Sequence, residues 1–179
     1  MIARPSTYRY VFCEGGLMSD SYYDVAQICI NGHVINSMAK DYPQSNQKYC
    51  SDCGEETITA CPSCGSNIRG HYHVPGVISF SNFHAPSYCF NCGSPYPWTA
   101  IRLEAAAELA DELDGLTTDE KEKLKSSLPD LVKDGPKTVV AETRFKKIIK
   151  KAGADAYEGM KTILVDVVSE TVKKSMFGA

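Results

Sequence analysis

The chain has 179 residues, a formal net charge of −3, 43% hydrophobic residues and 23% charged residues. This is the composition of a globular protein and excludes wholesale disorder. No run approaches the roughly 18 apolar residues of a membrane helix, and residues 1–16 lack the apolar core of a secretory signal peptide. We therefore expect a cytoplasmic protein with one ordinary domain or two small ones.

The composition changes sharply near residues 95–98. All eight cysteines and all four histidines lie within residues 1–97, whereas residues 98–179 are rich in Ala, Leu, Val, Glu and Lys. Cysteines at this density in a reducing compartment indicate metal or redox chemistry rather than disulfides. The predicted fold class is α+β: a small β-rich, two-zinc ribbon-like domain over residues 1–97, followed by a C-terminal helical bundle over residues 98–179.

The clearest strand signal in the first part is a hairpin. Residues 68–74 and 77–83 flank Pro75-Gly76, a pair suited to the two central positions of a type II turn. Three weaker strands are expected at residues 8–13, 24–30 and 57–60.

The second part begins with two predicted helices. Thr99 is the predicted N-cap of the first helix, which Gly115 follows. Thr117 and Glu120 form a capping box for the next helix. Pro129 is expected to close or reset that helix, because proline cannot continue the hydrogen-bond ladder.

Two more helices are predicted after residue 135. Pro136 opens the third and Gly153 ends it. Apolar residues at the i, i+3, i+4, i+7 spacing mark the fourth. They are Met160, Ile163, Leu164, Val167, Val168 and Val172. We expect these helices to pack as a small bundle.

Three CxxCG knuckles dominate the first part. Two thiolates three residues apart in a tight turn can hold a zinc ion at ~2.3 Å, and the following Gly lets the chain turn beneath the sulfurs. One CxxC motif is a weak signal, but three with the same trailing Gly strongly favour metal binding. The six cysteines are Cys50, Cys53, Cys61, Cys64, Cys89 and Cys92.

A fourth ligand pair is needed to complete two tetrahedral sites. Cys29 and His33 lie in a Gly-containing turn after an apolar run and can supply it. The alternative interpretation is a buried, unreactive Cys29 and a surface His33. We favour the ligand interpretation because Cys29 and His33 complete the eight ligands of two tetrahedral sites. We therefore predict two zinc ions.

Three pairings of these ligands are open. The favoured sequential scheme joins the first four ligands in chain order on one zinc and the last four on the other. A nested scheme joins the second and third pairs. A cross-braced scheme alternates the pairs, as RING-like domains do.

The remaining cysteine and histidines are weaker candidates. Cys13 is left over once seven cysteines and one histidine are assigned to two sites, and it is expected to be a strand or turn residue. His71 and His73 share one face of the predicted hairpin and could bind a metal or a phosphate, although an exposed polar face is the simpler interpretation. His84 is expected in a loop.

Catalysis is not expected. In thioredoxin-like enzymes a helix N-terminus lowers the thiol pKa of the CxxC motif, whereas each CxxC here is followed by Gly and a polar turn. The sequence shows no nucleophile motif, Gly-rich phosphate loop or HExxH. Four protein ligands would also leave no open position on zinc.

The charge distribution disfavours a nucleic-acid partner. Residues 1–97 carry five basic and seven acidic side chains, and two zinc ions with seven thiolates add about three negative charges. Phosphate binding calls for a basic surface instead. Residues 136–153 carry six basic side chains against one acidic side chain. A solvated or internally balanced face is the simpler interpretation of this segment, and docking of an acidic partner or an anionic surface is the alternative.

Residues 24–98 resemble zinc-ribbon domains through CSDCG, CPSCG and CFNCG. The strings ICINGHVIN, YCSDCG, CPSCGSNIRG, VPGV and YCFNCGSPYPWT resemble an uncharacterised bacterial family with several CxxC motifs. The resemblance implies a bacterial cytoplasmic origin and structural zinc, without a mechanism.

The expected function is that of a non-catalytic, zinc-stabilised interaction module or adaptor that binds another protein. Zinc would replace the hydrophobic core that so small a domain cannot build. The alternatives are a regulatory zinc-ribbon protein that binds nucleic acid, and a RING-like cross-braced module in a protein-modification pathway.

Overall fold

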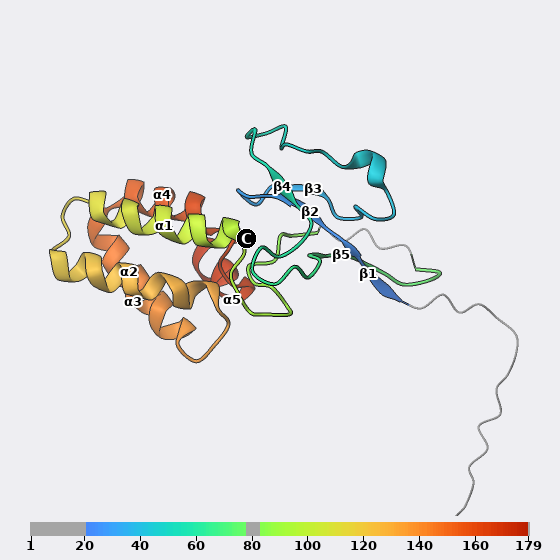
Figure 1. Cartoon of the computed structure of the whole chain (residues 1–179). Helices are drawn as coiled ribbons and strands as arrows, with labels where there is room; N and C mark the ends of the chain where they lie inside the picture. The colour runs from blue at the N-terminus through green and yellow to red at the C-terminus, as the bar shows by residue number, and fades with distance from the viewer. Residues whose placement is uncertain (1–20, 78–82, 179) are drawn as a thin grey trace, which may run out of the picture.

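The computed structural model describes residues 21–77 and 83–178 (Figure 1). Two small antiparallel sheets are followed by helices, so the fold is α+β as predicted. The two-stranded sheet pairs β1 (Tyr22–Val25) with β5 (Arg69–His73). The three-stranded sheet has the order β3 (Val34–Asn36), β2 (Gln27–Cys29), β4 (Thr57–Ile58). A 3-10 turn, η1 (Pro43–Ser45), follows β3.

The strand predicted at residues 24–30 is two strands in two sheets. The chain changes sheet at Ala26, whose N–H donates to the carbonyl of Ile68 at 2.9 Å. The pairing of β1 with β5 also shifts register between Tyr23 and Val25. The apolar run that suggested one strand therefore reflects burial on both sides of the bend.

The predicted hairpin is corrected in part. The turn at Pro75-Gly76 is present, because the N–H of Val77 donates to the carbonyl of Val74 at 3.1 Å and Gly76 has a φ of +74°. Within the described residues, however, β5 pairs with the distant β1. Residues 78–82 of the predicted partner strand and the strand predicted at residues 8–13 lie outside the described residues.

Four helices form the bundle. They are α1 (Pro97–Glu112), α2 (Thr118–Val132), α3 (Thr138–Ala152) and α4 (Ala154–Leu164). Helix α1 contacts α2 and α4, and α3 contacts the same two helices, so the bundle closes on itself. The chain ends with α5 (Glu170–Val172) and the π-helical η2 (Lys173–Phe177). No helix in residues 21–77 and 83–178 combines the length and apolar character needed to cross a membrane.

The start of α1 differs from the prediction. The helix begins at Pro97 with Tyr96 as its N-cap, and proline is favoured at the first helical position because its missing N–H is not needed there. Thr99 lies inside the first turn and is fully buried. Its hydroxyl donates to the carbonyl of Ser87 at 2.8 Å, so it joins the helix to the preceding loop instead of capping it.

Two further helix predictions were wrong in extent. Pro129 lies inside α2, which continues to Val132. The helix loses one hydrogen bond there, but Leu128 and Leu131 are buried on either side of the proline and hold the last turn in place. The apolar stripe predicted as one fourth helix is interrupted after Leu164 and resumes in α5, although most of its members are buried.

One apolar core runs through both parts of the chain. Ile28 and Ile68 of the sheets belong to the same buried cluster as Leu124 and Phe145 of the bundle. Trp98 belongs to the same cluster and is 1% exposed.

Candidate metal centres

The three knuckles share one backbone arrangement. In each, the N–H of the Gly donates to the carbonyl of the first Cys at 2.8–2.9 Å. The three glycines have φ values of +71° to +76°, a region that glycine enters without steric cost. The residue before the first Cys bridges to a residue after the Gly, and these pairs are Tyr49 with Glu56, Ala60 with Asn67 and Tyr88 with Pro95. Each knuckle is thus the tip of a very short hairpin.

The knuckles also share a pattern of burial. The first cysteine of each is 2% exposed, whereas the second lies on the surface. The buried members are Cys50, Cys61 and Cys89. One sulfur of every knuckle is therefore anchored in the protein and the other faces solvent.

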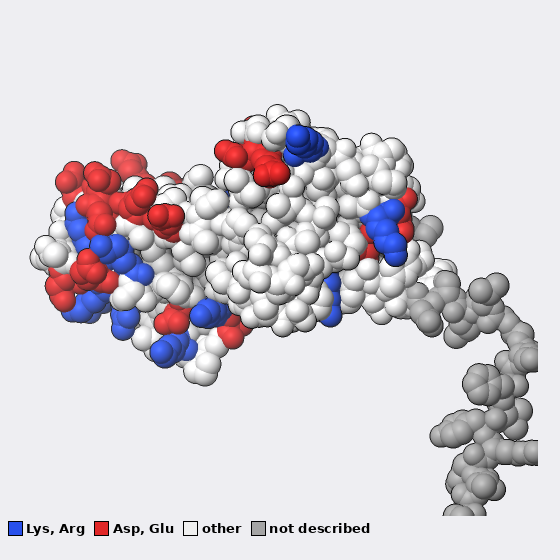
Figure 2. Space-filling view, in the orientation of Figure 1, with Lys and Arg blue, Asp and Glu red and all other residues white. Residues whose placement is uncertain are grey.

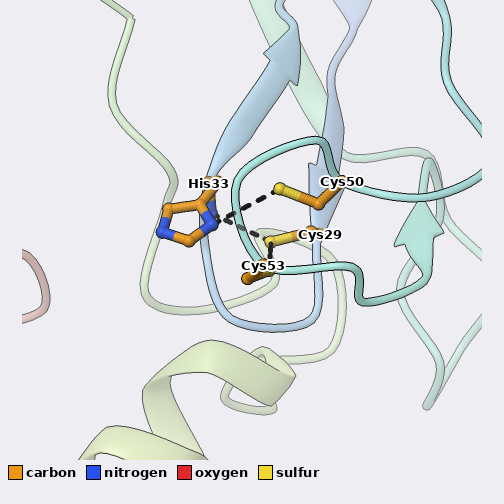
Figure 3. Close-up of side chains that lie close together, drawn as sticks. All are labelled: Cys29, His33, Cys50 and Cys53. Atoms are coloured by element: carbon orange, nitrogen blue, oxygen red, sulfur yellow. Dashed lines mark hydrogen bonds between the residues drawn. The ribbon is translucent and has the colours of Figure 1, made fainter.

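The first cluster contains Cys29, His33, Cys50 and Cys53 (Figure 3). The sulfurs of Cys29 and Cys53 are 3.9 Å apart. The imidazole of His33 turns its Nδ1 toward the sulfur of Cys50, at 3.4 Å. The backbone N–H of His33 donates to the sulfur of Cys29 at 3.2 Å, which orients the turn.

The second cluster contains Cys61, Cys64, Cys89 and Cys92. The sulfurs of Cys61 and Cys92 are 3.8 Å apart, and those of Cys64 and Cys89 are 3.7 Å apart. The side-chain amide of Asn91 approaches the sulfur of Cys64 at 3.6 Å. No sequence signal marks this contact, because Asn is common in any turn.

These distances fit a shared metal ion. Sulfurs at ~2.3 Å from one tetrahedral metal are ~3.8 Å apart along each edge of the tetrahedron. The three Sγ–Sγ distances of 3.7, 3.8 and 3.9 Å match that edge, whereas a disulfide would need ~2.05 Å. Each cluster keeps its four ligand atoms within 4.8 Å of one another. Both clusters can therefore hold a metal ion.

The thiols differ in acidity within each cluster. Burial raises the pKa of the Cys29 thiol to about 11. The backbone N–H of Glu55 lowers the pKa of the exposed Cys53 to about 7. Hydrogen bonds from Ser66, with a further one from Asn91, lower that of Cys64 to about 6. Since the thiolate is the form that binds metal, the lowered pKa values of the Cys53 and Cys64 thiols favour coordination near neutral pH.

The grouping follows the sequential scheme, and the nested and cross-braced schemes do not describe the structure. The other candidates lie elsewhere. Cys13 is outside the described residues. His73 packs against Tyr22 with ring centroids 5.1 Å apart. His71 and His84 line an aromatic pocket, and His84 also lines a second pocket that it shares with His33. Neither histidine belongs to a cluster.

The family match spans both parts of the chain. No curated protein and no solved structure matches the sequence. Residues 22–176 match the family described as "Uncharacterized protein conserved in bacteria (DUF2321)", from the start of β1 into η2. The strands, both clusters and all four long helices therefore lie within the region that matches the family. The chain belongs to this bacterial family, as the knuckle strings suggested.

Proposed function

We propose that each cluster binds one zinc ion as a structural site, and that the chain is a non-catalytic interaction module for a protein partner. The observation that carries the metal assignment is the agreement of three sulfur–sulfur distances with the edge of a zinc–thiolate tetrahedron. Four protein ligands per ion leave no coordination position for substrate or water. This supports a structural role.

Zinc is favoured over iron by the first cluster. Its ligand set of three sulfurs and one imidazole nitrogen is typical of structural zinc sites, whereas a four-sulfur set also suits iron. Elemental analysis of protein purified without chelator should give two zinc ions per chain and no visible thiolate-to-iron absorption. A reproducible value near one would remove one site, and a value near zero would contradict the proposal.

A groove between α2 and α3 supports a protein partner. It has a volume of about 540 Å³. Val139 is 65% exposed and Val140 56% exposed on its wall. Ile148 lies deeper in the same groove. The groove therefore offers apolar surface for an apolar stripe of another chain.

The rim of the groove is basic. Lys123 pairs with Asp119, and Lys151 pairs with Glu120. Arg144 and Lys147 also line the groove, and neither forms an ion pair within residues 21–77 and 83–178.

The distribution of charge favours a protein over a nucleic acid. Figure 2 shows acidic side chains along the upper edge of the helical end, over α1 and α4, with basic and acidic side chains interspersed below them. A phosphate backbone has no apolar surface to place against Val139 and Val140 on the wall of the groove. An acidic amphipathic helix of a partner protein can pack its apolar face against the two valines and pair its carboxylates with Arg144 and Lys147.

The test uses a synthetic amphipathic helix with leucines on one face and glutamates on the other. Binding should be saturable, and a peptide with lysines in place of the glutamates should bind at least tenfold more weakly. Val140→Asp and Arg144→Glu/Lys147→Glu should each weaken binding, whereas Lys40→Glu/Lys48→Glu on the sheet part should not. Equal binding of both peptides, or tight salt-sensitive binding of nucleic acid that the Arg144→Glu/Lys147→Glu change abolishes, would overturn the protein-docking proposal.

A further inference from the structure

An aromatic pocket lies between β5 and the knuckle of Cys89. Its volume is about 310 Å³. Most of its wall is aromatic, and its charged or titratable nitrogen groups come from Arg69, His71 and His84. None of the described residues that line it is Asp or Glu. The pocket is therefore suited to a planar ligand that accepts hydrogen bonds.

The guanidinium of Arg69 is held by two rings. Its Cζ lies 3.7 Å from the ring centroid of Phe90 and 4.9 Å from that of Tyr23. Phe90 belongs to the knuckle and Tyr23 to β1, so two separate segments fix this one side chain. A planar guanidinium held in this way presents its N–H groups as a rigid fork, and little side-chain entropy remains to be lost on binding. Within the described residues, Arg69 forms no ion pair with a carboxylate.

The surrounding rings retain exposed surface. Tyr23 is 51% exposed, Tyr72 46% and Phe90 53%. Tyr23 and Tyr72 lie against each other with ring centroids 4.6 Å apart, so the aromatic surface continues from Phe90 through Arg69 to Tyr72. Surfaces of this kind stack nucleobases, with a contribution from arginine.

The neighbouring metal centre limits the charge of the ligand. Phe90 lies between two cysteines of the second cluster, and four thiolates on one bound zinc ion would give that cluster a net charge of about −2. A free phosphate dianion is disfavoured there, because Arg69 supplies a single fixed positive charge. A neutral base avoids this repulsion.

We propose that this pocket binds an unpaired guanine base. The arginine fork matches the two adjacent acceptors of guanine, O6 and N7, whereas adenine presents a donor in place of one of them. The base comes either from a free guanine nucleotide or from an unpaired guanine in a single strand. This site goes beyond the proposed function, since it neither uses the α2–α3 groove nor depends on a protein partner.

The first test compares ligands on the zinc-loaded full chain by calorimetric titration. Guanosine and inosine, which share O6 and N7, should bind with similar affinity. Adenosine and 7-deazaguanosine, which each lack one acceptor, should bind about tenfold or more weakly. Equal binding of guanosine and adenosine, or no saturable binding of guanosine and its 5′-monophosphate at millimolar concentration, would overturn the proposal.

The second test changes the protein. Arg69→Lys keeps the charge but removes the fork, and should weaken guanosine binding about tenfold or more while zinc content and helical circular dichroism stay unchanged. Full retention of guanosine binding by a folded Arg69→Lys variant would contradict the proposal. If that variant fails to fold, the ligand comparison on the parent protein decides. A single-stranded oligonucleotide with one guanine that binds at least tenfold tighter than the monophosphate identifies a nucleic-acid source, and equal affinities identify the free nucleotide.

Discussion

Gly32 lies directly against the indole of Trp98. A Cβ placed on Gly32 would be 3.0 Å from the Cβ of Trp98 and 3.2 Å from its Cγ. Gly32 precedes His33 of the first cluster, and Trp98 lies in the first turn of α1. The first metal cluster and the helical bundle therefore meet at a point where only hydrogen fits.

Gly32→Ala should destabilise the protein. Gly32 has a φ of +93°, which costs any other residue about 1–3 kcal/mol, and the added methyl group also presses on Trp98. Thermal or denaturant unfolding measures the loss. Gly135→Ala is the matched control, because Gly135 has no left-handed φ and no atom within 4 Å of the added methyl. Equal effects of the two changes would contradict this account.

Single ligand changes should remove metals one at a time. Cys29→Ser should reduce the zinc content by one ion per chain and leave the second cluster loaded, because the two clusters share no ligand. Cys64→Ser should remove the other ion. Cys13→Ser is the control, since Cys13 is a predicted non-ligand outside the described residues. Loss of both ions from Cys29→Ser would show that the two sites fold as one.

Metal removal should expose Trp98. This residue is the only tryptophan of the chain. Its indole N–H donates to the carbonyl of Pro86 at 2.9 Å, and its ring stacks on Tyr96 with centroids 4.7 Å apart. Structural zinc contributes on the order of 10 kcal/mol to folding, so chelation should release this contact and move the Trp98 emission to longer wavelength. An unchanged emission at full zinc release would show that the bundle holds Trp98 without metal.

Thr117 should contribute measurably to the stability of α2. Its hydroxyl accepts from the N–H of Glu120, whose carboxylate in turn accepts from the N–H of Thr117. Thr117→Ala should cost about 1 kcal/mol. Thr118→Ala is the control, because Thr118 is exposed and makes no side-chain hydrogen bond among the described residues. A null result for Thr117→Ala would mean that packing alone fixes the start of the helix.

Local features of the fold could be read from the sequence, and distant ones could not. The knuckles and the Thr117 capping box involve residues within a few positions of each other, so spacing alone reveals them. The pairing of β5 with β1 joins residues 44 to 51 positions apart, and nothing in the sequence of either segment indicates which strand it pairs with.

Tertiary packing explains the remaining differences. Pro129 is a helix breaker by local propensity, but buried neighbours on both sides override that propensity. Thr99 has a side chain suited to an N-cap, but its hydroxyl donates to the carbonyl of Ser87 in the loop before α1. The sequence did not reveal the aromatic pocket around Arg69, because its rings come from β1, β5 and a knuckle, and no short motif contains them.

The uneven burial of the cysteines would give two bound zinc ions different routes of exchange. In the first cluster Cys53 is the exposed sulfur, whereas the second cluster exposes both Cys64 and Cys92. An incoming chelator must begin at an exposed thiolate, so the second ion should leave in the faster of two phases when a chromophoric chelator is mixed with the loaded protein. Release in a single phase would contradict this order. One chain would then carry a long-lived metal beside the helical bundle and a readily exchanged one next to the aromatic pocket.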